Sequence, residues 1–258
     1  MLLTIDVGNT ETKLGCFAMD GSELLQSWRV TTESKRTADE YGVFFSQLFA
    51  TADLRPSDVQ AVVVASVVPK LDQALEHAAR RYFGCEALFF KPHRQNLMRV
   101  ATERPGEVGA DLVAAAIGAR ELYGAPLIVV SYGTATVFMA IAANGDYQGV
   151  AIAPGINVSI DALVGRTAKL PQISLEAPRR AIGRDTISAL QSGIVYGFVG
   201  QTEALVARMR AEMETEAPVI ATGGMAEVVA RHTSIVREVN PHLSLIGLQR
   251  YYRAHRRA

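Results

Sequence analysis

The sequence predicts an α/β protein, and three observations lead to that prediction. Strand-like and helix-like stretches alternate along the 258 residues, which is the pattern of sheets covered by helices. Hydrophobic residues make up 49% of the chain, enough to bury a sizeable core. An apolar strand, a Gly/Thr turn and a second strand occur at the start of the chain and again at its centre, which predicts a duplicated topology.

The N-terminal half begins with a predicted hairpin. Residues 2–7 form an apolar strand that ends beside Asp6, residues 8–10 are turn formers, and residues 13–18 form a second strand. A third strand is expected around residues 27–31. The remaining predictions in this half are a helix over 38–52, a strand over 61–66, a helix over 70–83, a strand over 87–90 and a helix over 109–121.

The C-terminal half repeats the arrangement. A strand over 126–130 runs into the turn 131–134, and a partner strand follows over 135–142. A long helix over 185–213 has Asp185 and Thr186 as its candidate caps. We place the division near residue 115, which gives lobes 1–115 and 116–258. The long helix carries Gly193, Gly197 and Gly200, and these glycines would allow close packing at a homodimer contact.

Charge and composition exclude several classes of protein. The 26 basic and 26 acidic residues balance, so no general electrostatic attraction to nucleic acid or membrane is expected. Cys16 and Cys85 are too far apart for a zinc pattern and too few for a disulfide framework. No apolar run of about 18 residues predicts a membrane helix, and the expected location is the cytoplasm.

The first Gly-rich turn has the features of a phosphate-binding loop. Asp6 ends a buried strand, and Gly8 would let a ligand approach the backbone. Successive backbone amides in such a turn can bind an anion, and Asp6 could hold Mg²⁺ through water. The alternative is an ordinary hairpin in which Asp6 accepts hydrogen bonds from the turn.

Two later turns favour the phosphate interpretation. Gly133 and Thr134 also follow an apolar strand, and a third turn at 221–224 contains Gly223 and Gly224, against which a nucleotide could lie. The chain contains neither a P-loop nor a GxGxxG motif, so the common nucleotide-binding folds are not supported.

Asp111 is the candidate general base. It lies where the helix over 109–121 begins, and a positioned carboxylate can accept a hydroxyl proton during phosphoryl transfer. The alternative is that Asp111 only caps the helix. Ser66 and Ser131 lack a Gly-x-Ser-x-Gly setting, so a hydrolase triad is unsupported.

A series of ordered motifs resembles one family along nearly the whole chain. These motifs are IDVGNT at 5–10, RTADEYG at 36–42, SVVP at 66–69, EVGAD at 107–111, YGTAT at 132–136, IAPGI at 152–156, RTAKLP at 166–171, QSG at 191–193 and ATGG at 221–224. Together they resemble the type III pantothenate kinases, of the acetate and sugar kinase/Hsp70/actin superfamily. The resemblance implies a duplicated ribonuclease-H-like (actin-like ATPase) fold, with ATP in a cleft between two lobes. It also implies a homodimer, Mg²⁺, and a monovalent cation, K⁺ or NH₄⁺.

The resemblance also implies site residues. The ATP-binding set would be Asp6, Val7, Gly8, Asn9, Thr10, Glu11, Thr12, Lys13, Gly133 and Thr134, together with Gly223 and Gly224 from the turn described above. Pantothenate would be bound by Thr102, Gly109, Ala110, Asp111 and Leu112, and by Thr186 from a neighbouring subunit or a nearby helix. Ser131 would stand at the monovalent-cation position.

Four positions depart from the family pattern. Leu112 stands in place of an arginine, Ser131 in place of an aspartate, Thr102 in place of a tyrosine and Asp185 in place of an asparagine. An arginine fork recognises a carboxylate, which pantothenate carries and leucine cannot bind.

The implied activity is ATP-dependent phosphorylation of pantothenate to 4′-phosphopantothenate, the first step of coenzyme A synthesis. Two alternatives remain open at this point. One is a degenerate member that binds nucleotide without efficient kinase activity, and the other is a kinase that acts on a different alcohol.

Overall fold

The chain forms two compact units. The structure is a computed structural model, and it describes residues 1–21, 23–166, 171 and 173–256. One unit contains Met1–Leu122 and His242–Ala258, and the other contains Tyr123–Pro241. The C-terminal segment therefore belongs to the first unit, whereas the sequence-based division assigned it to the second lobe. Of the motif RTAKLP at 166–171, residues 167–170 lie outside the described residues.

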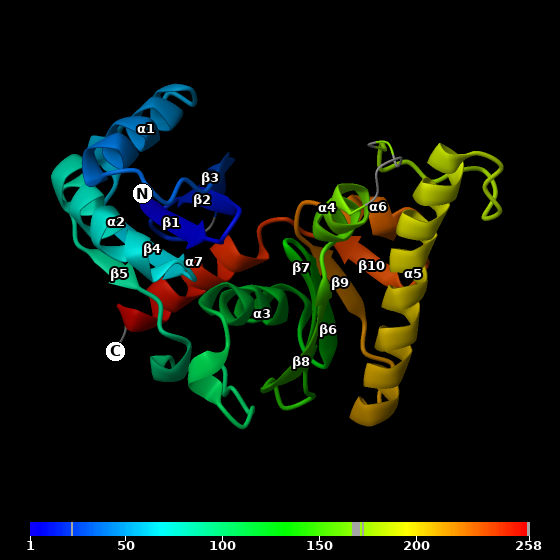
Figure 1. The fold of residues 1–258 in the computed structure, drawn as a ribbon. Helices are drawn as coiled ribbons and strands as arrows, with labels where there is room; N and C mark the ends of the chain where they lie inside the picture. The colour runs from blue at the N-terminus through cyan, green and yellow to red at the C-terminus, as the bar shows by residue number, and fades with distance from the viewer. Residues whose placement is uncertain (22, 167–170, 172, 257–258) are drawn as a thin grey trace. The chain divides into compact units, whose positions relative to one another are not determined.

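The first unit contains a mixed sheet. Within the described part of the unit, five strands lie in the order β3-β2-β1-β4-β5 (Figure 1). β1 is antiparallel to β2 and parallel to β4, β2 is antiparallel to β3, and β4 is parallel to β5. Their bounds are Leu2–Val7, Glu11–Phe17, Leu24–Thr31, Ala61–Ser66 and Ala87–Phe89. All five strands were predicted from the sequence, although β3 begins earlier than expected.

The helices of this unit follow local signals. α1 (Ala38–Ala50) begins at a capping box in which Thr37 and Glu40 bond each other's backbone amides. The helix predicted over 70–83 is correct in place but irregular, because α2 (Asp72–Ala78) continues as a wider π-helical turn. Short 3₁₀ turns each start with proline, which suits a first helical position: Pro56–Asp58, Pro69–Leu71, Pro92–Arg94 and Pro105–Glu107.

The alternation of side chains along β1 directs its two faces to different helices. Leu3, Ile5 and Val7 are buried in one cluster with residues of α1 and α2. The intervening residues Thr4 and Asp6 point to the opposite face, where α7 (Leu243–His255) packs against β1, β2 and β4. The C-terminal helix therefore covers the face of the sheet that presents Asp6.

Two glycines allow α7 to lie close to α3 (Ala110–Tyr123). A Cβ at Gly247 would stand 1.8 Å from the carbonyl oxygen of Ala114, and a Cβ at Gly118 would stand 2.0 Å from that of Leu243. Such distances leave no room for any side chain, so the contact between the two helices requires glycine at both positions.

The second unit repeats the topology of the first. Its described residues form a five-stranded sheet in the order β10-β9-β6-β7-β8 (Figure 1). β6 is antiparallel to β7 and parallel to β9, so β6 occupies the place that β1 holds in the first sheet. The bounds of β6 to β10 are Leu127–Tyr132, Ala135–Ile141, Tyr147–Pro154, Val219–Thr222 and Val236–Val239. The duplication expected from the two hairpins is confirmed, and β8 and β10 complete it.

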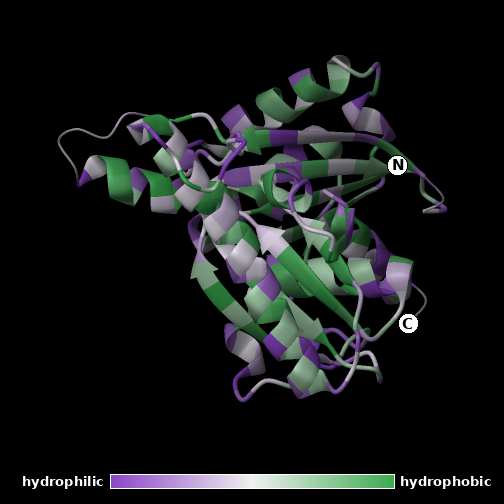
Figure 2. Cartoon of the chain, turned by 90° about the vertical axis from the view of Figure 1, so that its right-hand side faces the viewer, coloured by the Kyte–Doolittle hydropathy of each residue, from purple (hydrophilic) through white to green (hydrophobic). Residues whose placement is uncertain are grey.

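The helices of the second unit are α4 (Ile156–Gly165), α5 (Thr186–Met213) and α6 (Ala226–Ala230). Asp185 caps α5, because its side chain accepts a hydrogen bond from the backbone amide of Ser188. Asp185 is one of the two caps that the sequence predicted. Figure 2 shows hydrophobic stretches along the strands and hydrophilic ones in the loops. Within the described ranges, no helix is both long enough and apolar enough to cross a membrane.

Candidate active site

The first unit contains a buried carboxylate, Asp6, one oxygen of which has no hydrogen-bond partner among the described residues. Asp6 is only 4% exposed. Its Oδ2 accepts a hydrogen bond of 2.5 Å from the Ser244 hydroxyl on α7, and it lies 3.6 Å from Nζ of Lys13, its cross-strand neighbour on β2. Its Oδ1 is buried and has no hydrogen-bond partner among the described residues. A buried carboxylate oxygen is costly to leave unpaired, so this atom is suited to a ligand, a metal-bound water or an ion.

The turn after β1 is tight, and its tip is exposed. The amide of Gly8 donates to the carbonyl of Glu11 at 3.0 Å, and a Cβ at Gly8 would stand 2.9 Å from that oxygen. Asn9, Thr10 and Glu11 are exposed at the tip. The turn therefore presents an exposed tip next to the end of β1 that carries Asp6.

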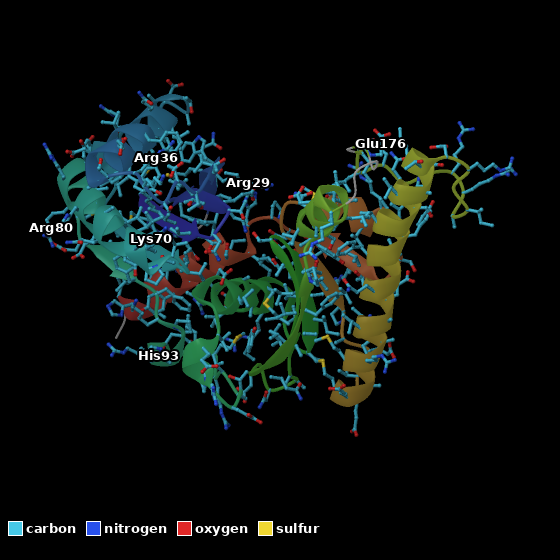
Figure 3. The ribbon with its side chains drawn as sticks, in the orientation of Figure 1. Arg29, Arg36, Lys70, Arg80, His93 and Glu176 are labelled. Atoms are coloured by element: carbon cyan, nitrogen blue, oxygen red, sulfur yellow. The ribbon has the colours of Figure 1, made fainter. Side chains whose placement is uncertain are left out.

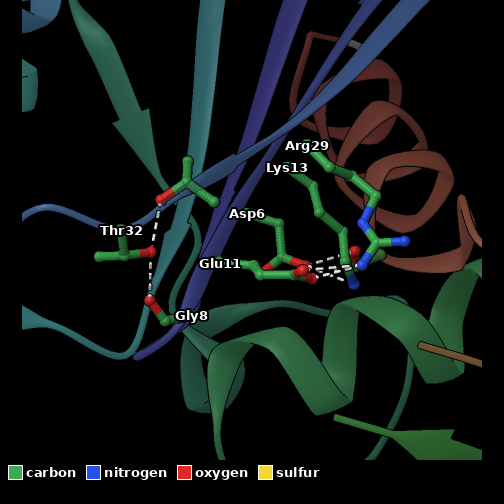
Figure 4. A network of polar contacts seen from close by, with 8 residues as sticks. Asp6, Gly8, Glu11, Lys13, Arg29 and Thr32 are labelled. Atoms are coloured by element: carbon green, nitrogen blue, oxygen red, sulfur yellow. Dashed lines mark hydrogen bonds and ion pairs between the residues drawn. The ribbon is translucent and has the colours of Figure 1, made fainter. Parts of the chain in front are cut away.

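Thr32, which follows β3, joins this turn through three hydrogen bonds, and Figure 4 shows those of its hydroxyl. Its hydroxyl donates to the carbonyl of Gly8 at 2.7 Å and lies 2.8 Å from the hydroxyl of Thr12. Its backbone amide donates to the carbonyl of Thr10 at 2.9 Å. A residue twenty positions beyond Thr12 thus contacts both ends of the turn.

Arg29 adds an exposed ion pair to the same hairpin. Arg29 lies on β3 (Figure 3), and its guanidinium reaches both carboxylate oxygens of Glu11 on β2, at 2.7 and 2.8 Å (Figure 4). Both side chains are more than two-fifths exposed, so solvent screens this pair strongly.

Asp111 lies in the first turn of α3 and is electrostatically coupled to Asp6. Burial and, next in size, the negative charge of Asp6 together raise the pKa of the Asp111 carboxyl to about 6. A hydrogen bond from the backbone amide of Leu112 and the charge of Lys13 act in the opposite direction. The Asp111 carboxylate therefore accepts a backbone hydrogen bond at the start of α3 and also lies near Asp6. The capping interpretation and the general-base interpretation are compatible.

His242 and Ser244 bring α7 into this group. His242 precedes α7, and burial, followed by the nearby Lys13 charge, lowers the pKa of its imidazole. Sequence reasoning missed His242, Ser244 and Thr32. Ser244 is 238 residues from Asp6, and no local pattern could have indicated that contact.

The predicted substrate residues divide into two groups. Gly109, Ala110 and Leu112 adjoin Asp111, and a Cβ at Gly109 would stand 2.5 Å from Oδ1 of Asp111. The Thr102 hydroxyl is buried without a hydrogen-bond partner in the described part of the chain.

The second unit places its two predicted turns side by side. Ser131 on β6 pairs with Thr222 on β9, so the turns that follow these strands leave the sheet at the same edge. Gly223 has a φ of +94°, and a Cβ there would stand 2.4 Å from the carbonyl oxygen of Tyr132. Gly133 and Thr134 are exposed in the turn after β6.

The remaining parts of the predicted site are Thr186 and the metal ligands. Thr186 is the first residue of α5 and is exposed. Across the residues with described positions, no group of three or more His, Cys, Asp or Glu side chains could hold a metal ion. A Mg²⁺ ion held by one carboxylate and by phosphate oxygens does not need such a group.

Two solved structures have a similar fold. An activator of the 2-hydroxyisocaproyl-CoA dehydratase from Clostridium difficile, with bound ADPNP, aligns over 99% of this chain and 96% of its own, with a TM-score of 0.56 and 11% identity. The ethanolamine utilization protein EutJ from Carboxydothermus hydrogenoformans aligns over 96% of this chain and 89% of its own, with a TM-score of 0.56 and 15% identity. With the duplicated topology, these similarities identify the fold as the actin-like α/β fold expected from the sequence.

Comparisons of sequence are more specific. A family model described as type III pantothenate kinase matches residues 2–208. A type III pantothenate kinase from Anaeromyxobacter sp. (strain K) is 46% identical over 249 residues, which cover 96% of this chain and 97% of that protein. One from Moorella thermoacetica is 46% identical over 252 residues, which cover 98% of each chain. This chain belongs to the type III pantothenate kinase family.

Proposed function

We propose that the protein transfers the γ-phosphoryl group of ATP to pantothenate, giving 4′-phosphopantothenate and ADP in the first step of coenzyme A synthesis. The observation that carries the proposal is the coupled pair Asp6 and Asp111 in the first unit, in a chain of this family. Burial and the charge of Asp6 give Asp111 a pKa of about 6, so it is ionised at neutral pH and close to the range in which a carboxylate is an effective base.

In the proposed reaction, Asp111 accepts the proton of the acceptor hydroxyl. The hydroxyl oxygen forms a bond to the γ-phosphorus, and the bond from that phosphorus to the bridging oxygen breaks, releasing ADP. Phosphoryl transfer depends mainly on positioning and charge stabilisation, which are the tasks of the remaining residues.

The phosphates would lie on the turn between β1 and β2. The predicted ATP set from Asp6 to Lys13 includes this exposed turn, whose backbone amides can bind anionic oxygens. Lys13 adds a positive charge from β2. In the second unit, Gly133 and Thr134, with Gly223 and Gly224, would contact ATP from the paired turns.

Mg²⁺ fits the residues around Asp6. The unpaired buried Oδ1 of Asp6 is an oxygen acceptor of the kind that binds a magnesium-bound water. Mg²⁺ supplies charge neutralisation on the phosphates when bound, and Asp6 would hold it through water. The monovalent-cation position falls at Ser131, which offers a hydroxyl without the carboxylate expected from the family. A homodimer with Thr186 near the acceptor of the neighbouring subunit, and a cytoplasmic location, complete the proposal.

A second candidate is a member of the family that binds nucleotide with weak kinase activity, or that phosphorylates a different alcohol. Leu112 favours it, because leucine follows Asp111 where an arginine would bind the pantothenate carboxylate. One charge-assisted contact of that kind contributes roughly 1.5–3 kcal/mol, or about ten- to a hundredfold in affinity.

One assay distinguishes these functions. The protein is incubated with Mg-ATP labelled at the γ-phosphate, K⁺ and either pantothenate or a panel of uncharged alcohols, and labelled products are separated. Labelled phosphopantothenate supports the first function. Labelled alcohol without phosphopantothenate supports a changed acceptor, and ATP binding without any labelled product supports the nucleotide-binding candidate.

A further inference from the structure

We propose that Thr32 is a positioning residue that holds the β1–β2 turn in the shape that binds the ATP phosphates. The inference rests on the proposed function, because the proposed function assigns the ATP phosphates as the ligand of that turn. It goes beyond that function because Thr32 lies outside the predicted ATP set, directly after β3, a strand that contributes no residue to that set.

The turn is closed by the backbone hydrogen bond from Gly8 to Glu11 and is otherwise open to solvent at its tip. Its tip residues Asn9, Thr10 and Glu11 are exposed. Gly8 gives the backbone extra freedom at the first position of the turn. Ordering a flexible loop at the moment of binding weakens affinity, whereas a loop ordered in advance binds more tightly.

Thr32 restrains this turn from the end of the neighbouring strand, directly after β3. Its hydroxyl bonds the carbonyl of Gly8 and the hydroxyl of Thr12, the residues that flank the turn, at 2.7 and 2.8 Å (Figure 4). Its backbone amide also donates to Thr10. The Gly8 bond is the important one, because it fixes the carbonyl at the first position of the turn and with it the orientation of the peptide that follows.

The side chain of Thr32, rather than the strand alone, makes this contact. Valine has nearly the same shape as threonine and lacks the hydroxyl, whereas serine keeps the hydroxyl and lacks the methyl group. The ion pair between Arg29 and Glu11 cannot replace the contact, because both side chains are exposed and screened.

The test compares Thr32→Val, Thr32→Ser and the wild-type protein in calorimetric titrations with Mg-ATP. We expect Thr32→Val to weaken ATP binding by about tenfold, the range for one lost positioning hydrogen bond, and Thr32→Ser to retain most of the affinity. Amide hydrogen exchange over residues 8–12, measured without nucleotide, should become faster in Thr32→Val alone. In turnover assays the KM for ATP should rise more than kcat falls.

Thr4→Val is the matched control. The Thr4 hydroxyl is fully buried in the same sheet and donates to the carbonyl of Gly15, away from the turn. Its loss should lower the melting temperature with ATP affinity changed by less than about twofold. If Thr32→Val does not fold, Thr32→Ala removes the same hydroxyl and is interpreted in the same way.

Equal ATP affinity of Thr32→Val and wild type would overturn the inference, as would a Thr32→Ser variant that binds as weakly as Thr32→Val. A wild-type protein that does not bind ATP would instead overturn the proposed function, and this inference with it. The two failures are therefore distinguished by the wild-type titration.

Discussion

The hydroxyl of Ser244 donates a hydrogen bond of 2.5 Å to Oδ2 of Asp6, which joins the C-terminal helix to the first strand. Both residues are buried, and the ammonium group of Lys13 lies 3.6 Å from the same oxygen. The contact fixes the orientation of the Asp6 carboxylate and leaves its Oδ1 available.

Ser244→Ala should therefore affect both stability and catalysis. The substitution leaves a buried carboxylate oxygen with one partner fewer, which costs roughly 1–3 kcal/mol of unfolding free energy. We also expect kcat to fall by about tenfold, because the carboxylate loses its fixed orientation. Denaturant unfolding and steady-state kinetics measure the two effects.

The control for Ser244 is Ser46→Ala on α1. Ser46 is partly buried and its hydroxyl bonds the carbonyl of Gly42 within the same helix. The change should alter stability by less than about 0.5 kcal/mol and leave kcat unchanged. Full activity of Ser244→Ala would show that Asp6 keeps its orientation without the serine.

Asp111→Asn should change the pH dependence of stability in a defined direction. The folded pKa of Asp111, about 6, lies above the usual carboxyl value, so the folded state favours the protonated form. Its contribution to stability is complete below the unfolded pKa of about 4 and is lost as the pH rises through about 6.

Asparagine cannot ionise and so avoids that loss. At pH 8 we expect Asp111→Asn to be more stable than wild type by about 1–3 kcal/mol, with the difference disappearing near pH 4. Chemical denaturation at both pH values measures it. A variant that is less stable than wild type at pH 8 would contradict the electrostatic coupling of Asp111 with Asp6.

The local parts of the fold could be predicted from the sequence, and the long-range parts could not. The β1–β2 hairpin, the cap of α5 at Asp185 and the two Gly/Thr turns depend on neighbouring residues, and each was predicted. β8 was missed because its exposed positions include the apolar residues Val150 and Ile152, so its sequence lacks the apolar–polar alternation that signals a strand. The irregularity after α2 was missed because the apolar spacing over 70–83 fits a regular helix equally well.

The site shows the same limit. Asp6 and Asp111 were found because each stands at a recognisable strand or helix end. Ser244 and Thr32 are ordinary residues of a helix and a strand end, and only the folded chain brings them to Asp6 and to Gly8. The membership of α7 in the first unit was missed for the same reason, because nothing in its sequence specifies which sheet it covers.

Gly247→Ala should destabilise the first unit. The added Cβ would stand 1.8 Å from the carbonyl oxygen of Ala114, so α3 and α7 must separate. We expect a loss of about 2–4 kcal/mol in unfolding free energy. Gly106→Ala is the control, since a Cβ there meets no described atom within 4 Å, and it should change stability by less than about 0.5 kcal/mol. Equal stability of the two variants would refute the close helix contact.

The double variant Leu112→Arg with Ser131→Asp restores two groups that the resemblance implies. If their absence limits the enzyme, kcat/KM for pantothenate should rise by about tenfold or more, since arginine can bind the substrate carboxylate with two hydrogen bonds. Leu112→Lys with Ser131→Asp is the control, because lysine supplies charge without the fork. An unchanged kcat/KM in the arginine variant would mean that other residues bind the carboxylate.

The central claim is that Asp111 accepts the proton of the acceptor hydroxyl while ATP donates its γ-phosphoryl group. The most direct measurement is the rate of phosphopantothenate formation by wild type and Asp111→Asn between pH 5 and 8, at saturating Mg-ATP. We predict a wild-type rate that falls as the pH drops through about 6, and a loss of about 10²–10⁴-fold in the variant at pH 7.5. Wild-type turnover that Asp111→Asn matches at every pH would contradict the account.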